Sequence, residues 1–140
     1  MTFFRLICNL FLISIVFTAC DDKMVTKEYI KNLKHLKIDS ISLESPYKNI
    51  QKKIILALKN ENLKINENSI YIIKVDYTDY KKICNNPMTS AYDATFDGFI
   101  RLTLFKKGTR IYMCQKEFRG KLDVDDFEKL LSQMKNELNF

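Results

Sequence analysis

Apolar side chains alternate with a period of two residues in the middle and second half of the chain, and this pattern constrains the fold most. Segments 69–80, 92–105 and 110–118 carry it, with Tyr71, Ile73, Val75 and Tyr77 in the first and Ile100, Leu102 and Leu104 in the second. Successive side chains of a β-strand point to opposite faces, so the spacing predicts three strands, each with one apolar face. The sequence Lys106-Lys107-Gly108-Thr109 predicts the turn of a β-hairpin between the last two.

Two amphipathic helices are predicted on either side of these strands. Ser45-Pro46 predicts an N-cap and a first-turn proline for a helix over 46–63. Asp123, with Asp126 three residues later, predicts the capped start of a closing helix. The expected buried positions are Ile50, Ile54, Ile55 and Leu58 in the first helix and Phe127, Leu130, Leu131, Met134 and Leu138 in the second.

The remaining element is a strand over 36–44, where the alternation changes phase near Asp39-Ser40 and suggests a bulge. The element order is then β-α-β-β-β-α. Two helices are most simply placed together on the apolar face of one sheet. The sequence therefore predicts an α+β two-layer sandwich with an antiparallel or mixed four-stranded sheet. The turn-rich segment 79–95 is its longest loop and the natural place for a binding feature.

The first twenty residues have the composition of a lipoprotein signal peptide. Arg5 precedes an uncharged run from Leu6 to Ala19, which at about fourteen residues is shorter than the roughly twenty that a membrane-spanning helix needs. The end of the run, Phe17-Thr18-Ala19-Cys20, resembles a bacterial lipobox, in which the cysteine is acylated and becomes the mature N-terminus. Ordinary cleavage with a free cysteine and an uncleaved signal anchor are the alternatives.

The expected organisation follows from this start. Residues 1–19 are the signal peptide, 20–35 are the lipidated N-terminus with a polar tether, and 36–140 form a single domain. Cleavage removes Arg5, one of 23 basic residues, and none of the 17 acidic ones, so the mature chain carries about five net positive charges. A solvated surface is the default interpretation of these charges, and a docking face for anionic lipid or lipopolysaccharide phosphate is the sharper one. Export argues against nucleic acid as a partner.

The four cysteines have different expected fates. Cys8 leaves with the signal and Cys20 is acylated, which leaves Cys84 and Cys114 as a pair in an oxidising compartment. A disulfide between them is the favoured interpretation, and two unpaired thiols are the alternative. No second cysteine or histidine stands beside either of them, so a zinc site is disfavoured.

The residue inventory favours a protein that is not an enzyme and holds no cofactor or metal. A hydrolytic triad needs a histidine held between a nucleophile and an acid, and the only histidine, His35, is expected to be an ordinary exposed side chain at the end of the tether. The acidic run from Asp123 to Glu128 lacks the glycine and the spacing of a calcium loop. Three scattered glycines, at 98, 108 and 120, form no phosphate-binding loop.

Lipobox, polar tether and element order together resemble the lipopolysaccharide-assembly lipoprotein (LptE) family. The resemblance covers 38–44, 46–63, 69–80, 94–105, 110–120 and the helix from Asp123. It implies a two-layer lipoprotein of the outer membrane that sits inside a large β-barrel partner and helps to place lipopolysaccharide in the outer leaflet. The expected contacts to such an anionic ligand are basic residues near strand ends, namely Lys74, Lys81, Lys82, Lys106, Lys107 and Arg110.

Two points stay open. Asp21, directly after Cys20, resembles an inner-membrane retention signal, whereas the family resemblance favours the outer membrane, with the domain facing the periplasm. The second hypothesis for function is an envelope lipoprotein that binds a protein partner as an adaptor, inhibitor or adhesin.

Overall fold

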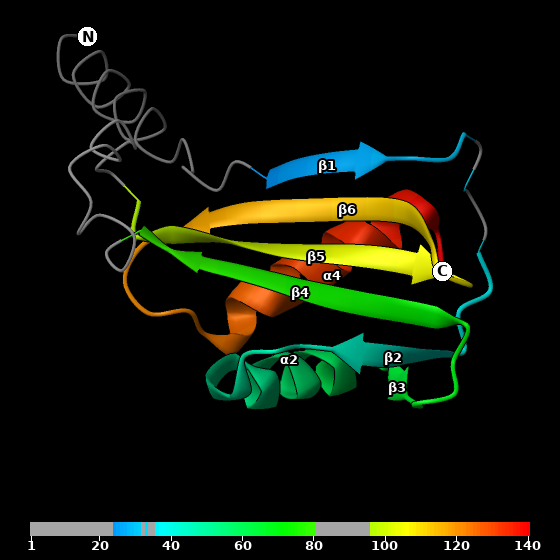
Figure 1. The fold of residues 1–140 in the computed structure, drawn as a ribbon, viewed down its shortest axis with the longest axis horizontal. Coiled ribbons are helices and arrows are strands. Elements are labelled where there is room, and N and C mark those ends of the chain that lie inside the picture. Colours follow the sequence, from blue (N-terminus) through cyan, green and yellow to red (C-terminus); the bar gives the residue numbers. More distant parts are fainter. Residues whose placement is uncertain (1–23, 32, 34–35, 81–95) are drawn as a thin grey trace, which may run out of the picture.

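The computed structural model describes residues 24–31, 33, 36–80 and 96–140 as one sheet with two helices (Figure 1). The strands are β1 (Met24–Glu28), β2 (Ser40–Glu44), β3 (Lys64–Ile65), β4 (Tyr71–Asp79), β5 (Gly98–Lys106) and β6 (Thr109–Phe118). The helices are α2 (Lys48–Asn60) and α4 (Val124–Leu138). This is an α+β fold, as the sequence predicts.

The sheet is mixed and has the strand order β1-β6-β5-β4-β2-β3. Strands β4, β5, β6 and β1 pair antiparallel, whereas β2 runs parallel to its neighbours β4 and β3. A parallel pair needs a crossover, and α2 supplies it between β2 and β4. The expected four strands are therefore six, because β1 and β3 extend the sheet at its two edges.

Strand β1 corrects the expectation of a tether over residues 20–35. Met24–Glu28 pairs with β6 from Met24 opposite Lys116 to Glu28 opposite Tyr112. The segment has only two apolar residues, and one of them, Val25, is 49% exposed. The sequence therefore shows too little apolar alternation here to predict a strand. Edge strands commonly have this character, because one of their sides has no neighbouring strand.

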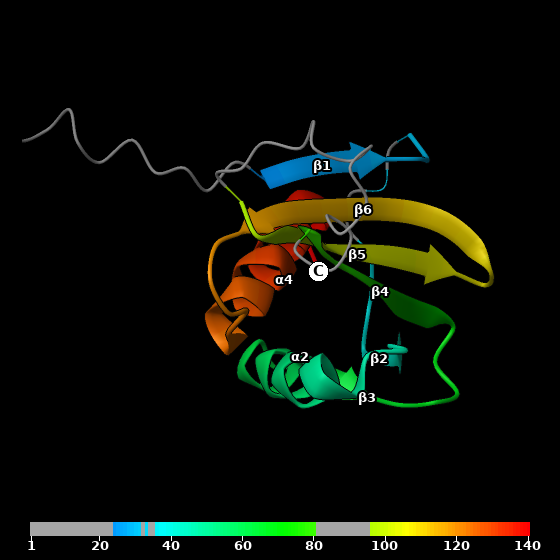
Figure 2. The ribbon, with the colours of Figure 1, turned by 60° about the vertical axis from the view of Figure 1, so that its left-hand side comes forward.

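Both helices cover the same face of the sheet (Figures 1 and 2). The expected stripe of α4 is fully buried there, against Ile73, Leu102 and Leu104 among others. In α2, Ile50, Ile54 and Leu58 are buried as expected, but Ala57 takes the place expected for Ile55, which is only half-buried. The opposite face of the sheet, called the outer face below, is covered by none of the described elements.

The element ends were predicted with mixed success. At α4, Asp123 Oδ1 accepts from the Val124 N–H at 2.8 Å and Asp126 Oδ2 accepts from the Asp123 N–H at 2.9 Å, which confirms the capping box. Helix α2 instead begins after Tyr47 with no side-chain cap, so the predicted cap at Ser45 is wrong. The predicted bulge near Asp39 is also wrong, because β2 begins at Ser40.

Gly98 lies where two chain segments approach closely. A Cβ atom at this position would stand 2.0 Å from the Thr78 carbonyl oxygen and 2.7 Å from the Phe118 ring. The Phe118 ring stacks on Tyr77 with a centroid distance of 5.8 Å. Only glycine therefore lets β5 begin between these two neighbours.

We expect Gly98→Ala to lower the free energy of unfolding by about 2–3 kcal/mol, since neither a backbone oxygen nor a stacked ring can yield easily. Urea unfolding of the detergent-solubilised protein, followed by circular dichroism, measures the change. Thr109→Ala at an exposed position is the control and should stay within about 0.5 kcal/mol. Equal midpoints for the two variants would contradict the close approach.

Candidate functional site

The β5–β6 hairpin ends in a two-residue turn that presents a lysine under backbone strain. Lys107 has φ 48° and Gly108 has φ 79°, the left-handed pair typical of a type I′ turn. Asparagine commonly occupies the first of these positions, and a lysine there costs about 1 kcal/mol. The strained backbone at Lys107 thus lowers the stability slightly, and the lysine places a positive charge at the hairpin tip.

A change of register beside the turn sets the direction of Arg110. The β5–β6 pairing shifts between Leu104 and Phe105, so that Arg110 comes to stand opposite Phe105. Such a bulge redirects side chains relative to a regular ladder. The Arg110 guanidinium lies 5.7 Å from the Phe105 ring centroid and 5.3 Å from that of Tyr29.

These contacts continue into a row of cations and aromatic rings on the outer face. Lys27 Nζ stands 5.0 Å from the Tyr29 centroid, and Lys74 Nζ stands 5.1 Å from the Phe105 centroid. We call Lys27, Tyr29, Arg110, Phe105 and Lys74 the hairpin-end stripe. It joins residues from β1, β6, β5 and β4 with the segment directly after β1, and each cation–ring contact contributes about 0.5–1 kcal/mol.

The charges of the stripe differ in what neutralises them. Lys74 forms an ion pair with Glu44 Oε2 at 2.8 Å, so its charge is offset within the sheet. Within the described residues, no carboxylate forms an ion pair with Lys27, Lys106, Lys107 or Arg110. An external anion would therefore meet these cations without displacing a protein carboxylate.

The structure brings together four of the six basic residues expected to contact an anion. Lys74, Arg110, Lys106 and Lys107 lie at or beside the hairpin end, and Lys106 Nζ stands 5.6 Å from the Tyr71 ring centroid. Lys81 and Lys82, together with the rest of the expected binding loop from 81 to 95, lie outside the described residues.

Sequence reasoning missed Lys27 and Tyr29, because they belong to the segment expected to be a tether. It also missed Phe105 as a surface residue, although its alternation with Leu104 placed it on the outer face. The signal that could have found Tyr29 was an aromatic residue in an otherwise polar stretch.

A cavity of about 290 Å³ lies at the opposite end of the sheet, where β4 and β6 end. The residues that line it include Ile50, Lys53, Tyr77, Asp79, Asp97 and Phe118. Burial, followed by the neighbouring Asp79, raises the pKa of Tyr77. Among the described lining residues there is no histidine, cysteine or serine that could act with the two carboxylates.

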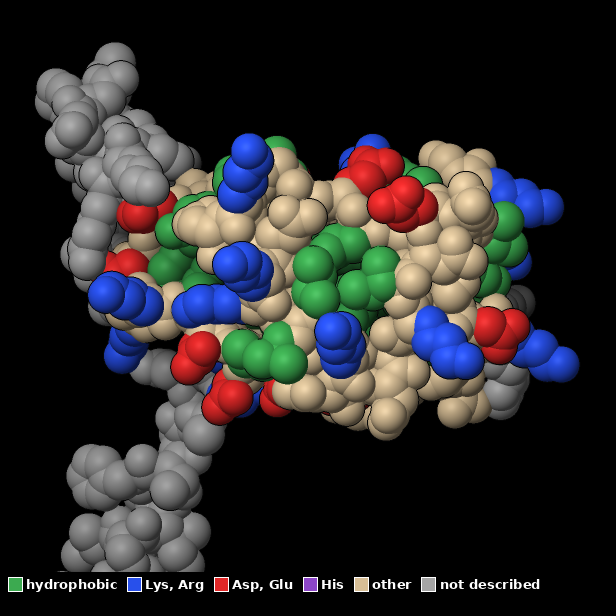
Figure 3. All heavy atoms as spheres, turned by 90° about the horizontal axis from the view of Figure 1, so that it is seen from below, with side chains coloured by type: hydrophobic (Ala, Val, Ile, Leu, Met, Phe, Trp, Pro, Cys, Tyr) green, Lys and Arg blue, Asp and Glu red, His purple; other side chains and the backbone are tan. Residues whose placement is uncertain are grey.

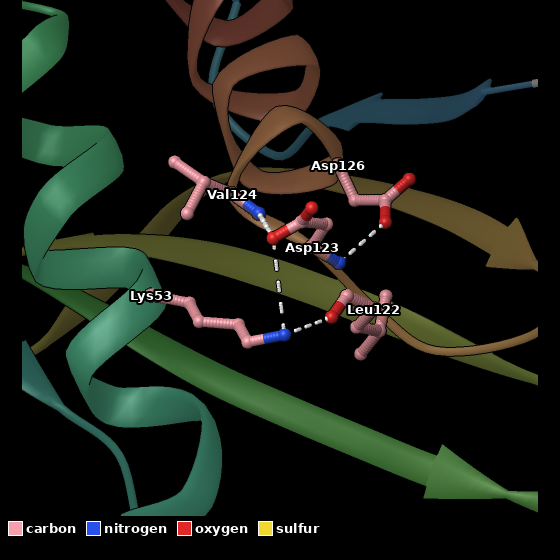
Figure 4. A network of polar contacts seen from close by, with 5 residues as sticks. All are labelled: Lys53, Leu122, Asp123, Val124 and Asp126. Atoms are coloured by element: carbon pink, nitrogen blue, oxygen red, sulfur yellow. Dashed lines mark hydrogen bonds and ion pairs between the residues drawn. The ribbon is translucent and has the colours of Figure 1, made fainter.

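Lys53, at the rim of this cavity, is tied into the fold (Figure 4). Its Nζ donates to the Leu122 carbonyl oxygen and stands 3.9 Å from Asp123 Oδ1, the atom that caps α4. This network fastens α2 to the loop that precedes α4. The charge of Lys53 is thus part of the packing of the two helices.

Buried polar groups also join α4 to β6. The Tyr112 hydroxyl donates to Glu137 Oε2 at 2.9 Å, and Lys116 Nζ stands 3.0 Å from Asp126 Oδ1. The Cys114 thiol donates to the Leu130 carbonyl oxygen at 3.5 Å. Burial, with Glu137 as a second cause, raises the pKa of the Cys114 thiol to about 12. A thiol with this pKa is protonated and unreactive near neutral pH.

The predicted disulfide joins this buried thiol to a residue that the structure does not describe. Cys114 is fully buried and free in the structure, and Cys84 lies outside the described residues. Since the Cys114 side chain points between the sheet and α4, Cys84 would have to enter the core to reach it. Cys20 likewise lies outside the described residues, and its lipidation stays a prediction.

Comparisons of the chain with protein-family models, curated proteins and solved structures find no match. The described residues contain no helix that is long and apolar enough to cross a bilayer. They also contain no group of three or more histidine, cysteine or acidic side chains that could hold a metal ion. The resemblance to the LptE family therefore stays a hypothesis.

We expect Cys114 to resist alkylation by iodoacetamide at pH 8 in the folded protein, because its thiol is buried and protonated. In urea without reductant, the same residue should become alkylated, as peptide mass spectrometry would show. A Cys84–Cys114 linked peptide in the non-reduced digest would contradict this expectation and support the bridge. A reduced, denatured sample is the control and should show both cysteines alkylated.

Proposed function

We propose that this chain is a lipoprotein of the bacterial cell envelope, acylated on Cys20, that binds an anionic partner through the hairpin-end stripe and is not an enzyme. The partner that we favour is lipopolysaccharide, and the role is its assembly at the outer membrane. The single observation that carries the proposal is the row of cations and aromatic rings in the hairpin-end stripe, with Lys106 and Lys107 beside it at the hairpin tip.

The geometry of the stripe supports an anion that also has apolar parts. Arginine recognises phosphate with a planar set of donors, and lysine adds point charges. The Arg110 guanidinium contacts the rings of both Tyr29 and Phe105, so less rotational freedom is lost when an anion binds. A phosphorylated glycolipid offers phosphates next to apolar groups and suits such a surface.

The sequence before the sheet supports the anchor. Several acyl chains on Cys20 would hold the protein on a membrane almost permanently, whereas one chain would not. We expect Cys20→Ser to release the protein from the membrane fraction, and intact mass spectrometry of the wild-type protein to find acyl chains on residue 20. A wild-type protein that starts elsewhere or lacks acyl chains would overturn the anchor.

Direct binding tests the ligand. We expect the full-length protein in detergent to bind lipopolysaccharide with an affinity that falls as salt rises, since the contacts are ionic and lie at an exposed surface. The double variant Lys106→Glu/Arg110→Glu should bind at least about tenfold more weakly, a loss equivalent to about 1.4 kcal/mol. The matched control Lys48→Glu/Lys52→Glu makes the same charge change at exposed positions at the start of α2, at the opposite end of the sheet. The proposed site would be ruled out if both variants lost the same affinity for lipopolysaccharide, or if neither variant lost any.

Lys107→Asn separates binding from stability. Asparagine suits the left-handed position of the turn, so this variant should be more stable than the wild type by about 0.5–1 kcal/mol in urea unfolding. The same variant should bind lipopolysaccharide more weakly, since it lacks the charge at the tip. Higher stability with unchanged binding would remove Lys107 from the site.

Cell-level tests address the assembly role. Depletion should lower surface lipopolysaccharide, and gentle solubilisation should recover a large barrel protein with the chain. Normal amounts of lipopolysaccharide together with no barrel would rule out this role.

An edge of the sheet favours the second candidate function, binding of a protein partner. Strand β1 is an edge strand of the sheet, and its Val25 side chain is 49% exposed. An extended segment of another protein could add to such an edge through main-chain hydrogen bonds. Pull-down from gently solubilised membranes with mass spectrometry would distinguish a soluble partner of this kind from a barrel.

A further inference from the structure

The position of β1 relates the lipid anchor to the rest of the sheet. Only residues 21–23 separate Cys20 from Met24, the first residue of β1. Four residue steps span at most about 14 Å, so Met24 lies within that distance of an acylated Cys20. Met24 pairs with Lys116, close to the end of the sheet where Asp79, Gly98 and Phe118 stand side by side.

We propose that this end of the sheet, the anchor end, rests on the surface of the bilayer that holds the acyl chains, with anionic lipid headgroups as its partner. We define the anchor end by Tyr80, Phe96, Phe99, Arg119 and Lys121. The inference rests on the acylation of Cys20 and assigns an interaction surface separate from the hairpin-end stripe.

The composition of the anchor end fits a membrane surface. Arg119 lies 4.9 Å from the Phe96 ring centroid, and the rings of Tyr80 and Phe99 are 6.2 Å apart. The three aromatic side chains are half-buried, and Lys121 is exposed. Aromatic rings with polar or basic neighbours are enriched where protein meets lipid headgroups.

Lysines on α2 extend the basic surface toward this end. Lys48 is the first residue of α2 and Lys52 follows one turn later, with no acidic residue in the first turn. Cations at a helix N-terminus oppose the helix dipole, so local helix stability does not explain them. In Figure 3, basic side chains lie at the left-hand end, where α2 begins, with acidic ones among them, and further basic side chains lie at the right-hand end.

The acidic side chains of the anchor end are partly engaged within the fold. Asp97 accepts a hydrogen bond from the Gly120 N–H, and Asp123 caps α4 and faces Lys53. These two carboxylates therefore have partners within the fold, whereas Lys121 forms no ion pair with a carboxylate of the described residues.

Distance favours the anchor end over the hairpin end as the membrane contact. From Gly98 to Lys106, β5 rises through eight steps of about 3.4 Å, which puts the hairpin tip about 27 Å further along the sheet. Screening at physiological salt limits the field of the bilayer to about 8 Å. The hairpin-end stripe then points away from the anchoring bilayer and would take its anion from the opposite side.

The test measures which end approaches the lipid. Full-length acylated protein with Cys84→Ser is reconstituted into vesicles of phosphatidylethanolamine and phosphatidylglycerol that contain a spin-labelled headgroup lipid. A fluorophore is attached at Asn49→Cys, beside the anchor end, or at Thr109→Cys, in the hairpin. Both positions are exposed and uncharged. We expect the lipid label to quench Asn49→Cys at least about threefold more than Thr109→Cys.

Charge variants then test the surface itself. Lys48→Glu/Lys52→Glu should lower the quenching at Asn49→Cys at least about twofold, whereas the control Lys59→Glu/Lys64→Glu should leave it unchanged. Equal or stronger quenching at Thr109→Cys, or quenching at neither position in protein that floats with the vesicles, would overturn the proposed orientation alone. Wild-type protein that does not float with the vesicles would overturn both the anchor and the orientation.

Discussion

The pairing of β5 on both of its sides is the constraint on which the rest of the structure depends. All nine residues of β5 pair with β4, and all nine also pair with β6. The inner side chains of this strand, such as Leu102 and Leu104, are fully buried under the helices. The two ends of β5 lie at the two ends of the sheet: Gly98 lies at the anchor end, and Lys106 lies at the hairpin turn.

The polar interactions inside the fold serve to fix α4 and α2 over this sheet. Tyr112 and Lys116 on β6 bind carboxylates of α4, and Lys53 joins α2 to the loop before α4. Such groups are costly to bury unless they are paired, and each pair specifies one position of a helix. On the outer face, cations lie on aromatic rings instead, and Lys27 and Arg110 there form no ion pair with a carboxylate of the described residues.

Local patterns predicted the central part of the fold. The hairpin, α4 and its capping box follow from short-range alternation, helical spacing and turn residues, each of which depends on neighbours in the sequence. Strand β1 could not be predicted in this way, because its place at the sheet edge depends on pairing with β6. The hairpin-end stripe was predicted in part for the same reason: Arg110 stands beside a recognisable turn, whereas Lys27 and Tyr29 join the stripe only through β1. The shift of register at Phe105, which directs Arg110, left no signal in the sequence.

The pairing of the first strand with the last also has a consequence for how the sheet forms. Met24 meets Lys116, so closing this contact requires almost the entire intervening chain, and the entropy of loop closure grows with that length. Contacts of such high sequence separation form slowly compared with a local hairpin. During synthesis from the N-terminus, the residues of β1 are made first but pair with β6 last. Until β1 pairs, the edge of β6 can pair with other strands.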